Sequence, residues 1–287
     1  MTDTLTPRER QEIEAANATG RRPVVFVHGL WLLASSWDRW RRLFDDAGFA
    51  TLAPGWPGDP ESVEAARVNP EVFAHKMVQQ VTDHYADAIG RLARTPAVVG
   101  HSFGGLIAQK LAGEGLSAAT VAIDPAPFRG VLSLPAAAIK SSAAVLSNPA
   151  NRGRAIALTF EQFTYGWANA LPEDEARQIY DEFHVAGSGV PVFQVVAANL
   201  NPWTEIKVDT RNPDRGPLLL ISGEKDHQVP RAAVQGAYKQ QQHNAGVTEF
   251  VEIPNRGHSL TIDSGWRDVA GTALEFIKAH SRQPEAV

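Results

Sequence analysis

The sequence contains no cysteine. This absence excludes disulfide bonds, thiolate-bound metal ions and a cysteine nucleophile. An excess of positive charge is missing as well, because 27 lysines and arginines stand against 32 aspartates and glutamates and give a formal net charge of −5. Acidic and basic residues are interspersed along the chain, so the sequence shows no basic surface of the kind that binds nucleic acid or anionic membranes.

Long hydrophobic runs are also lacking. No apolar run approaches the roughly 20 residues of a membrane span, and the start of the chain, MTDTLTPRER, has no apolar stretch of signal-peptide length. We therefore expect a cytoplasmic protein without a nucleic-acid or membrane partner, and the oligomeric state stays open. No pattern implies a metal ion or a cofactor, so we expect neither. A neutral small molecule fits the charge best as the partner.

Apolar runs of strand length alternate with amphipathic stretches of helical period from residue 23 onward. Strands that are apolar throughout are typical of a parallel sheet, because crossover helices cover both of its faces. The sequence therefore predicts an α/β fold, a three-layer α/β/α sandwich around a mostly parallel sheet of about six strands. The predicted strands are 24–27, 49–53, 97–99, 120–123, 218–221 and 250–253, and the predicted sandwich helices are 36–47, 70–94, 103–115, 231–242 and 263–280.

One interval breaks this alternation. About 90 residues separate the run ending at Ile123 from the run beginning at Leu218, far more than a single crossover needs. Helical patterns over residues 134–146, 154–167 and 172–184 predict a mainly helical cap inserted before the penultimate strand. We expect the cap to comprise residues 128–213, the core residues 23–127 and 214–287, and an N-terminal arm residues 1–22, with a short helical pattern around residues 7–16.

The segment Gly100-His101-Ser102-Phe103-Gly104-Gly105 directly follows one predicted strand and begins a predicted helix. A serine on such a tight turn must adopt strained backbone angles, and small residues two positions to either side let neighbouring segments approach. The turn exposes the hydroxyl at a helix N-terminus and leaves the Phe103 amide free to donate to an oxyanion. We therefore interpret Ser102 as a nucleophile and not as an ordinary capping serine.

A second motif, His28-Gly29-Leu30-Trp31, ends the first predicted strand. Carboxyl ends of parallel strands share one edge of the sheet, so this loop can expose a backbone amide near Ser102. We assign the Leu30 amide as the second oxyanion donor. Trp31 could belong to the oxyanion hole or to the pocket wall, and His28 is a candidate pocket residue whose simpler role is to shape the loop.

A serine hydroxyl attacks only when a base removes its proton, and a neutral imidazole suits that task near neutral pH. Of the nine histidines, His258 follows the last predicted strand, which brings it to the edge that carries Ser102. Asp226, after the penultimate strand, is the candidate acid that orients the imidazole. Glu224 and Asp124 are the alternatives, although Asp124 followed by a proline is also typical of a turn.

On these residues the chain resembles the α/β-hydrolase superfamily over residues 23–127 and 214–287. The chain order Ser102, Asp226, His258 and the His-Gly loop ahead of the serine carry the resemblance. Segments 100–105 and 223–230 are similar to small carboxylesterases, lipase-like esterases and cofactor-free haloperoxidases or perhydrolases, and a serine at position 102 argues against the dehalogenase and epoxide-hydrolase branches. Family members usually have two further strands before the His-Gly strand, so the resemblance predicts a sheet trimmed at one edge.

The resemblance implies acyl transfer through an acyl-enzyme on Ser102, and the function expected is a carboxylic ester hydrolase, a serine esterase for small, largely apolar esters. Lactonase, carbon–carbon bond hydrolase and perhydrolase activities use the same three residues, and a non-catalytic small-ligand-binding protein is an alternative of another class. Large apolar groups favour an apolar substrate, although each could instead belong to the cap's own core. The candidate pocket residues are His28, Trp31, Phe128, Phe163 and Trp167.

Overall fold

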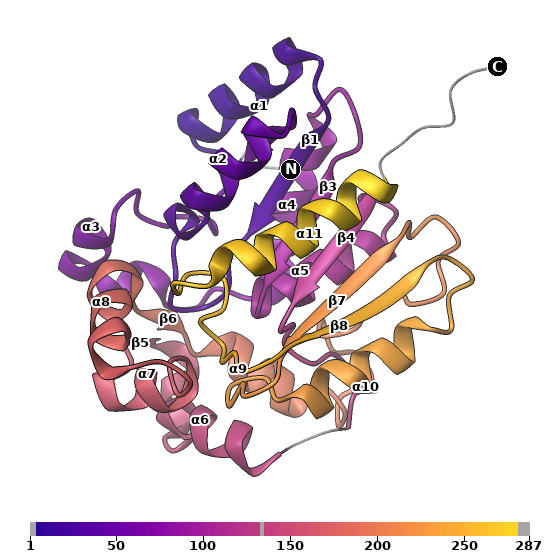
Figure 1. Cartoon of the computed structure of the whole chain (residues 1–287). Coiled ribbons are helices and arrows are strands. Elements are labelled where there is room, and N and C mark those ends of the chain that lie inside the picture. The colour runs from indigo at the N-terminus through magenta and orange to yellow at the C-terminus, as the bar shows by residue number, and fades with distance from the viewer. Residues whose placement is uncertain (1–3, 133–134, 281–287) are drawn as a thin grey trace.

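Six parallel strands form the central sheet in the computed structural model, which describes residues 4–132 and 135–280 (Figure 1). Their order across the sheet is β2-β1-β3-β4-β7-β8. Every neighbouring pair is parallel, so all carboxyl ends lie at one edge. The strands are β1 (Pro23–Val27), β2 (Ala50–Leu52), β3 (Ala97–His101), β4 (Ala119–Ile123), β7 (Leu218–Gly223) and β8 (Thr248–Ile253).

Alternate side chains of each central strand enter two separate cores. In β1, Val25 and Val27 pack into one core, whereas Val24 and Phe26 pack into the other. Helices α4 (Val78–Gly90), α5 (Phe103–Gly113) and α10 (Arg231–Gln241) cover the first face, and α2 (Asp38–Asp46) and α11 (Trp266–His280) cover the second. Burial on both faces explains why these strands read as continuous apolar runs, and the predicted three-layer sandwich is confirmed.

Helix α1 (Pro7–Thr19) packs beside the edge strand β2. Its start is fixed by a capping box, in which the Thr6 side chain accepts from the Glu9 amide and the Glu9 carboxylate accepts from the Thr6 amide. The same carboxylate accepts from the Gly55 amide at 3.0 Å, and Ile13 is buried in the core. No strand precedes β1 within residues 4–22, as the predicted trimmed edge requires.

Two predicted helices are interrupted. Residues 70–94 form a short 3-10 helix, η2 (Pro70–Phe73), and then α4, because Ala74 is extended and His75 has a φ of 62°. Residues 154–167 contain the short strand β5 (Ala155–Ile156), and only α7 (Phe160–Gly166) is helical. Helical periodicity in the sequence therefore predicted two helices that are longer than the observed ones.

The chain between β4 and β7, residues 124–217, is called here the inserted segment. Figure 1 shows its helices at one end of the sheet, and β5 pairs with β6 (Gly187–Ser188) in a small antiparallel ribbon. The cap boundaries at 128 and 213 stay a prediction. Its helices are α6 (Ala136–Leu146), α7, α8 (Glu173–Phe183) and α9 (Val190–Ala197), with the 3-10 helix η3 (Pro149–Gly153) between α6 and β5.

The remaining elements are short: α3 (Val63–Val68) and the 3-10 helix η1 (Ala34–Trp37). In the stretches 4–132 and 135–280, no helix has both the length and the apolar character needed to cross a bilayer.

Candidate active site

Ser102 lies on a sharp turn between β3 and α5. Its backbone angles are φ 58° and ψ −122°, a region that residues with a Cβ atom rarely adopt. The turn needs glycine on both sides: a Cβ at Gly100 would lie 2.1 Å from the carbonyl oxygen of Gly104, and one at Gly104 would lie 2.0 Å from that of Val27. The Ser102 amide donates to the carbonyl of Ile123 at 2.9 Å, which ties the turn to β4.

Two hydrogen bonds link the hydroxyl of Ser102 to a carboxylate through one imidazole. His258, in the loop between β8 and α11, has its Nε2 atom 2.9 Å from Ser102 Oγ and its Nδ1 atom 2.6 Å from Asp226 Oδ2. A carboxylate only accepts, so Nδ1 carries a proton and the Nε2 lone pair faces the hydroxyl. All three residues are buried, so little water competes for these bonds.

Backbone donors hold Asp226 in the loop between β7 and α10. Its Oδ1 atom accepts from the amides of Gln228 at 2.6 Å and Val229 at 2.8 Å, which leaves Oδ2 for His258. The alternative Glu224 is exposed and accepts from the Asn255 amide at 2.7 Å. The geometry therefore brings Asp226, and not Glu224, to the histidine.

The loop after β1 lies directly against the serine turn. A Cβ at Gly29 would lie 2.8 Å from Ser102 Cβ and 3.4 Å from the Phe103 amide nitrogen, so only glycine allows this approach. Trp31, two residues on, has a φ of 65°. Across residues 4–132 and 135–280 neither the Leu30 amide nor the Phe103 amide donates to a protein acceptor.

An apolar cavity of about 250 Å³ opens beside Ser102. Phe103 contributes to its wall, whereas Leu30 does not. Among the described residues, its polar side chains are Ser102, Ser142 and Gln228, and no charged side chain lines it. The apolar wall comes from Phe103 at the start of α5, from the turn after β4, from α6 and α9 of the inserted segment, and from the start of α10 with the residues just before it. It comprises Phe103, Ala126, Pro127, Pro135, Ala138, Ile139, Leu146, Val192, Val195, Val196, Val229, Pro230 and Ala233.

The five predicted pocket residues do not line this cavity. Trp167 lies edge-on against the His258 ring at 4.5 Å and stacks on Phe163, so both belong to packing behind the base. Phe128 is buried in the core, and the indole of Trp31 donates to the Ile156 carbonyl at 2.9 Å. We had expected large aromatic residues to line the cavity. The size of a side chain, however, does not determine which face of a segment faces the cavity.

His28 also points away from the cavity. Its Nε2 atom lies 3.2 Å from Asp59 Oδ2, its ring stacks on Trp56, and Lys76 pairs with the same carboxylate. These contacts bury the His28 ring immediately before the loop that carries Leu30. His28 therefore shapes the loop, the simpler of the two roles its sequence position suggested.

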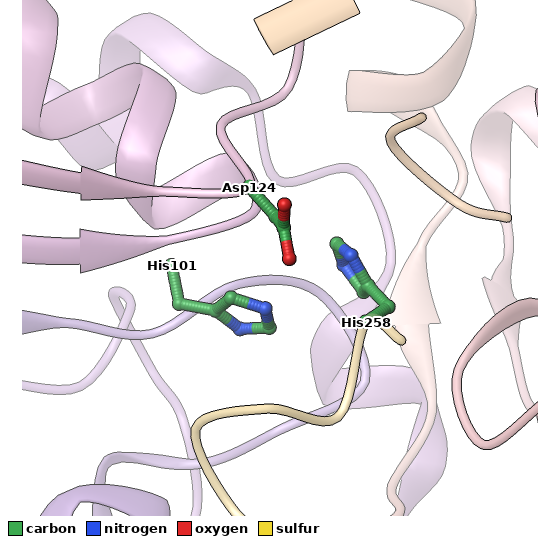
Figure 2. Close-up of side chains that lie close together, drawn as sticks. All are labelled: His101, Asp124 and His258. Carbon is green, nitrogen blue, oxygen red and sulfur yellow. The ribbon is translucent and has the colours of Figure 1, made fainter. Parts of the chain in front are cut away.

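Asp124 and His101 lie immediately behind the base. Figure 2 shows the Asp124 carboxylate directed toward the space between the rings of His101 and His258. One nitrogen or oxygen of each lies within 4.8 Å of the others, a spacing that a metal ion could bridge. Both ring nitrogens of His258 already bond to Ser102 and Asp226, so His258 has no free nitrogen for a metal ion. Its position is therefore better explained by the hydrogen bonds to Ser102 and Asp226 than by a metal site.

Sequence reasoning missed the side of the site formed by α9. This helix was not predicted, although a proline at its second position in the apolar run VPVFQVVA is a typical helix start. It placed the loop after β1 near Ser102 but did not identify Gly29 as the residue that permits the close approach, because that contact joins two segments far apart in the chain.

Comparisons with known proteins agree with this architecture. No curated protein is significantly similar to this chain, whereas many solved structures are. A monoacylglycerol lipase from Paleococcus ferrophilus is 21% identical with a TM-score of 0.60, covering 90% of this chain and 94% of its own. An extracellular alpha/beta-hydrolase from a Paenibacillus species is 19% identical with a TM-score of 0.63, covering 88% and 98%.

A pyrethroid hydrolase from Sphingobium faniae is 18% identical with a TM-score of 0.60, and the match covers 90% of this chain and 98% of that one. At such identities the likeness concerns the fold. The family model described as "Alpha/beta hydrolase family" matches residues 24–272, which include the serine turn, Asp226 and His258. The chain therefore belongs to the alpha/beta hydrolase family, a family of hydrolase-type enzymes.

Proposed function

We propose that the protein is a serine esterase that cleaves carboxylic esters of small, largely apolar molecules. The observation that carries the proposal is the unbroken hydrogen-bond chain from Ser102 through His258 to Asp226, whose two bonds measure 2.9 Å and 2.6 Å. This order of hydroxyl, imidazole and carboxylate is the arrangement that activates a serine for attack on a carbonyl carbon. The cytoplasm is the location we expect for this activity.

The reaction starts with attack by Ser102 Oγ on the ester carbonyl while His258 Nε2 accepts the hydroxyl proton. Asp226 stabilises the imidazolium that forms, and the amides of Leu30 and Phe103 donate to the oxyanion of the tetrahedral intermediate. The intermediate collapses when His258 returns the proton to the leaving alkoxide, which departs as the alcohol. Water then attacks the acyl-enzyme with His258 again as base, and the acid leaves with Ser102 regenerated.

The cavity supports an apolar substrate of modest size. Its volume of about 250 Å³ lies below the roughly 300–1,000 Å³ of pockets that hold drug-sized ligands. A charged acyl group would lose its hydration without gaining a partner there, because the wall formed by the described part of the chain contains no charged residue. A neutral ester with a short aliphatic chain or a single ring fits these constraints best.

The test is hydrolysis of p-nitrophenyl esters with acyl chains of increasing length, by the wild type and Ser102→Ala. We expect turnover that rises with chain length until the cavity is filled and then falls, and loss of nearly all activity in the variant. Activity retained by Ser102→Ala would refute the nucleophile assignment. If esters are not cleaved but lactones are opened, carbon–carbon bonds cleaved or peracids formed, those reactions of the same residues replace the proposal. Tight binding of a small ligand without turnover would favour a non-catalytic binding protein.

A further inference from the structure

A second carboxyl group, Asp124, is enclosed behind the base without a full set of partners. It follows β4 directly, has a φ of 39° and is completely buried. Its Oδ1 atom accepts from the Gly223 amide at 2.8 Å. Within the described residues, Oδ2 has no hydrogen-bond donor. An ionised carboxylate in that position would bury a charge that lacks compensation, which is strongly unfavourable.

Both aspartates are anchored at Gly223: Asp124 Oδ1 accepts from the Gly223 amide at 2.8 Å, and the Asp226 amide donates to the Gly223 carbonyl at 3.4 Å. After burial and the charge of Asp226, a hydrogen bond between the two carboxyl groups is a further cause that raises the pKa of Asp124. Two neighbouring buried carboxylates repel each other and share one proton more readily than they both ionise. If one carboxyl holds a proton, Oδ2 of Asp124 gains a partner and the repulsion disappears. The contact is satisfied only in that protonation state, since two ionised carboxylates are both acceptors.

Counting donors shows which carboxyl keeps the proton. Asp226 accepts three N–H bonds, from the amides of Gln228 and Val229 and from His258 Nδ1, whereas Asp124 accepts one, from Gly223. N–H donors stabilise the ionised form of a carboxyl group. Burial, and next the negative charge of Asp226, raise the pKa of Asp124 well above its usual range, in agreement with this count.

The other neighbour of Asp124 supplies no positive charge. Burial and the charge of His258 lower the pKa of His101 well below its usual range, so its ring is neutral. His101 comes from β3, Asp226 from the loop after β7 and His258 from the loop after β8, and these are the titratable groups that face Asp124. A carboxylate at position 124 would therefore have a counter-charge only while His258, which has a ring nitrogen within 4.8 Å, carries a second proton during the reaction.

We propose, resting on the function proposed above, that Asp124 is a positioning residue that keeps its proton and donates Oδ2–H to the carboxylate of Asp226. The bond fixes the carboxylate that orients His258 and spreads its negative charge over two side chains. Asp124 itself touches neither Ser102 nor the reacting atoms. An ionised Asp124 would act as a rival acid for His258, so the protonation state decides which acid serves the base.

Substitution by asparagine separates the two states. The amide of Asp124→Asn is neutral, donates through Nδ2 and accepts through Oδ1, so it reproduces a protonated aspartate but not an ionised one. We expect kcat for a p-nitrophenyl ester to stay within about threefold of wild type in Asp124→Asn and to fall about 10⁴-fold in Asp226→Asn. Asp124→Leu, which cannot donate, should lose about 10- to 100-fold in kcat with KM unchanged.

A pH profile and an infrared spectrum supply readouts that a merely structural role would not move. In Asp124→Leu the carboxylate of Asp226 bears its full negative charge and stabilises the imidazolium form of His258. The acidic limb of the kcat/KM profile should therefore shift to higher pH in Asp124→Leu. In Asp124→Asn it should not shift. The infrared difference spectrum, wild type minus Asp124→Asn above neutral pH, should show the carbonyl stretch of one protonated carboxyl group. This measurement does not depend on whether Asp124→Leu folds.

The outcomes distinguish this inference from the esterase proposal. If Asp124→Asn is as inactive as Asp226→Asn, or if the protonated carbonyl band is absent, Asp124 is ionised and the inference fails while the esterase stands. An Asp124→Leu variant with wild-type kcat and pH profile also overturns it. If Ser102→Ala remains active the esterase fails, and the infrared difference still decides the state of Asp124.

Discussion

The two sides of the Ser102 hydroxyl differ in chemistry and in origin. On one side, His258 and Asp226 come from loops at the carboxyl edge of the sheet and are fixed by hydrogen bonds of 2.6–2.9 Å. On the other, α6 and α9 of the inserted segment present alanine, valine and isoleucine side chains to the cavity. The first side needs particular atoms at particular distances, whereas the second needs only bulk and apolar character. Changes to the first should affect every substrate, and changes to the second should affect which substrate is accepted.

The largest effect is expected from Ser102→Ala, matched with Ser142→Ala on the other side of the same cavity. Removal of the nucleophile should lower kcat about 10⁴-fold or more, whereas Ser142→Ala should stay within about threefold because its hydroxyl has no part in the reaction. Steady-state kinetics on one p-nitrophenyl ester check both variants. Equal losses in the two would remove the distinction between the sides.

Next in size is the effect of Gly104→Ala on stability. The added Cβ would lie 2.0 Å from the Val27 carbonyl oxygen, so the serine turn must shift against β1. We expect the free energy of unfolding to fall by about 3 kcal/mol or more, with activity lost as well. Gly271→Ala in α11 is the matched control: its Cβ would meet nothing within 4 Å, and it should gain about 0.5–1 kcal/mol. Urea unfolding measures both, and a Gly104→Ala protein as stable as the wild type would be incompatible with the described turn.

His184 provides a pH test of the inserted segment. Burial, and next the charge of Arg67, lower its pKa to about 3 in the folded protein, and its Nε2 atom accepts from the Leu158 amide. Between pH 6.5 and 3 the unfolded chain binds a proton there that the folded chain does not. Stability from this group is therefore complete above about pH 6.5 and decreases as the pH falls, by about 1.4 kcal/mol per pH unit.

The slope is checked by unfolding at pH 7, 6 and 5 in the wild type, in His184→Gln and in His243→Gln. His243 is exposed, so its variant should keep the wild-type slope, whereas His184→Gln should flatten it by about one proton. If His184→Gln keeps the wild-type dependence of stability on pH, a neutral His184 does not stabilise the inserted segment.

The smallest effect is expected in the apolar wall. Val195→Phe would fill part of the 250 Å³ cavity, so kcat/KM for the longest accepted acyl chain should fall about tenfold relative to the acetate ester. Val247→Phe, at a residue that is 42% exposed and outside the cavity, is the control and should leave the ratio unchanged. A uniform loss on all chain lengths in Val195→Phe would mean that this wall supports the chemistry and not the choice of substrate.

The same contrast explains how much the sequence revealed. The parallel sheet and the approach of Ser102, Asp226 and His258 follow from patterns that local geometry enforces: apolar strands, a turn that only glycines permit, and loops at shared strand ends. These constraints act within a few residues of each side chain. The sequence therefore predicted this side of the site residue by residue.

The apolar side could not be predicted in the same way. Trp167 and Phe163 were expected to line the pocket, yet they pack behind His258, and the wall is made of smaller residues on α6 and α9. Which face of a helix meets a cavity is decided by tertiary packing among several apolar faces of similar strength. Helical period does not distinguish them, and α9 itself was not expected.

Activation of Ser102 by His258 can be tested by covalent labelling with an alkyl phosphonofluoridate. The reagent phosphonylates an activated serine, and peptide mass spectrometry locates the modified residue. We expect one phosphonyl group per chain on Ser102, none on Ser102→Ala, and labelling of His258→Ala slowed about 100-fold or more. Labelling of a different residue, or an undiminished rate in His258→Ala, would contradict it.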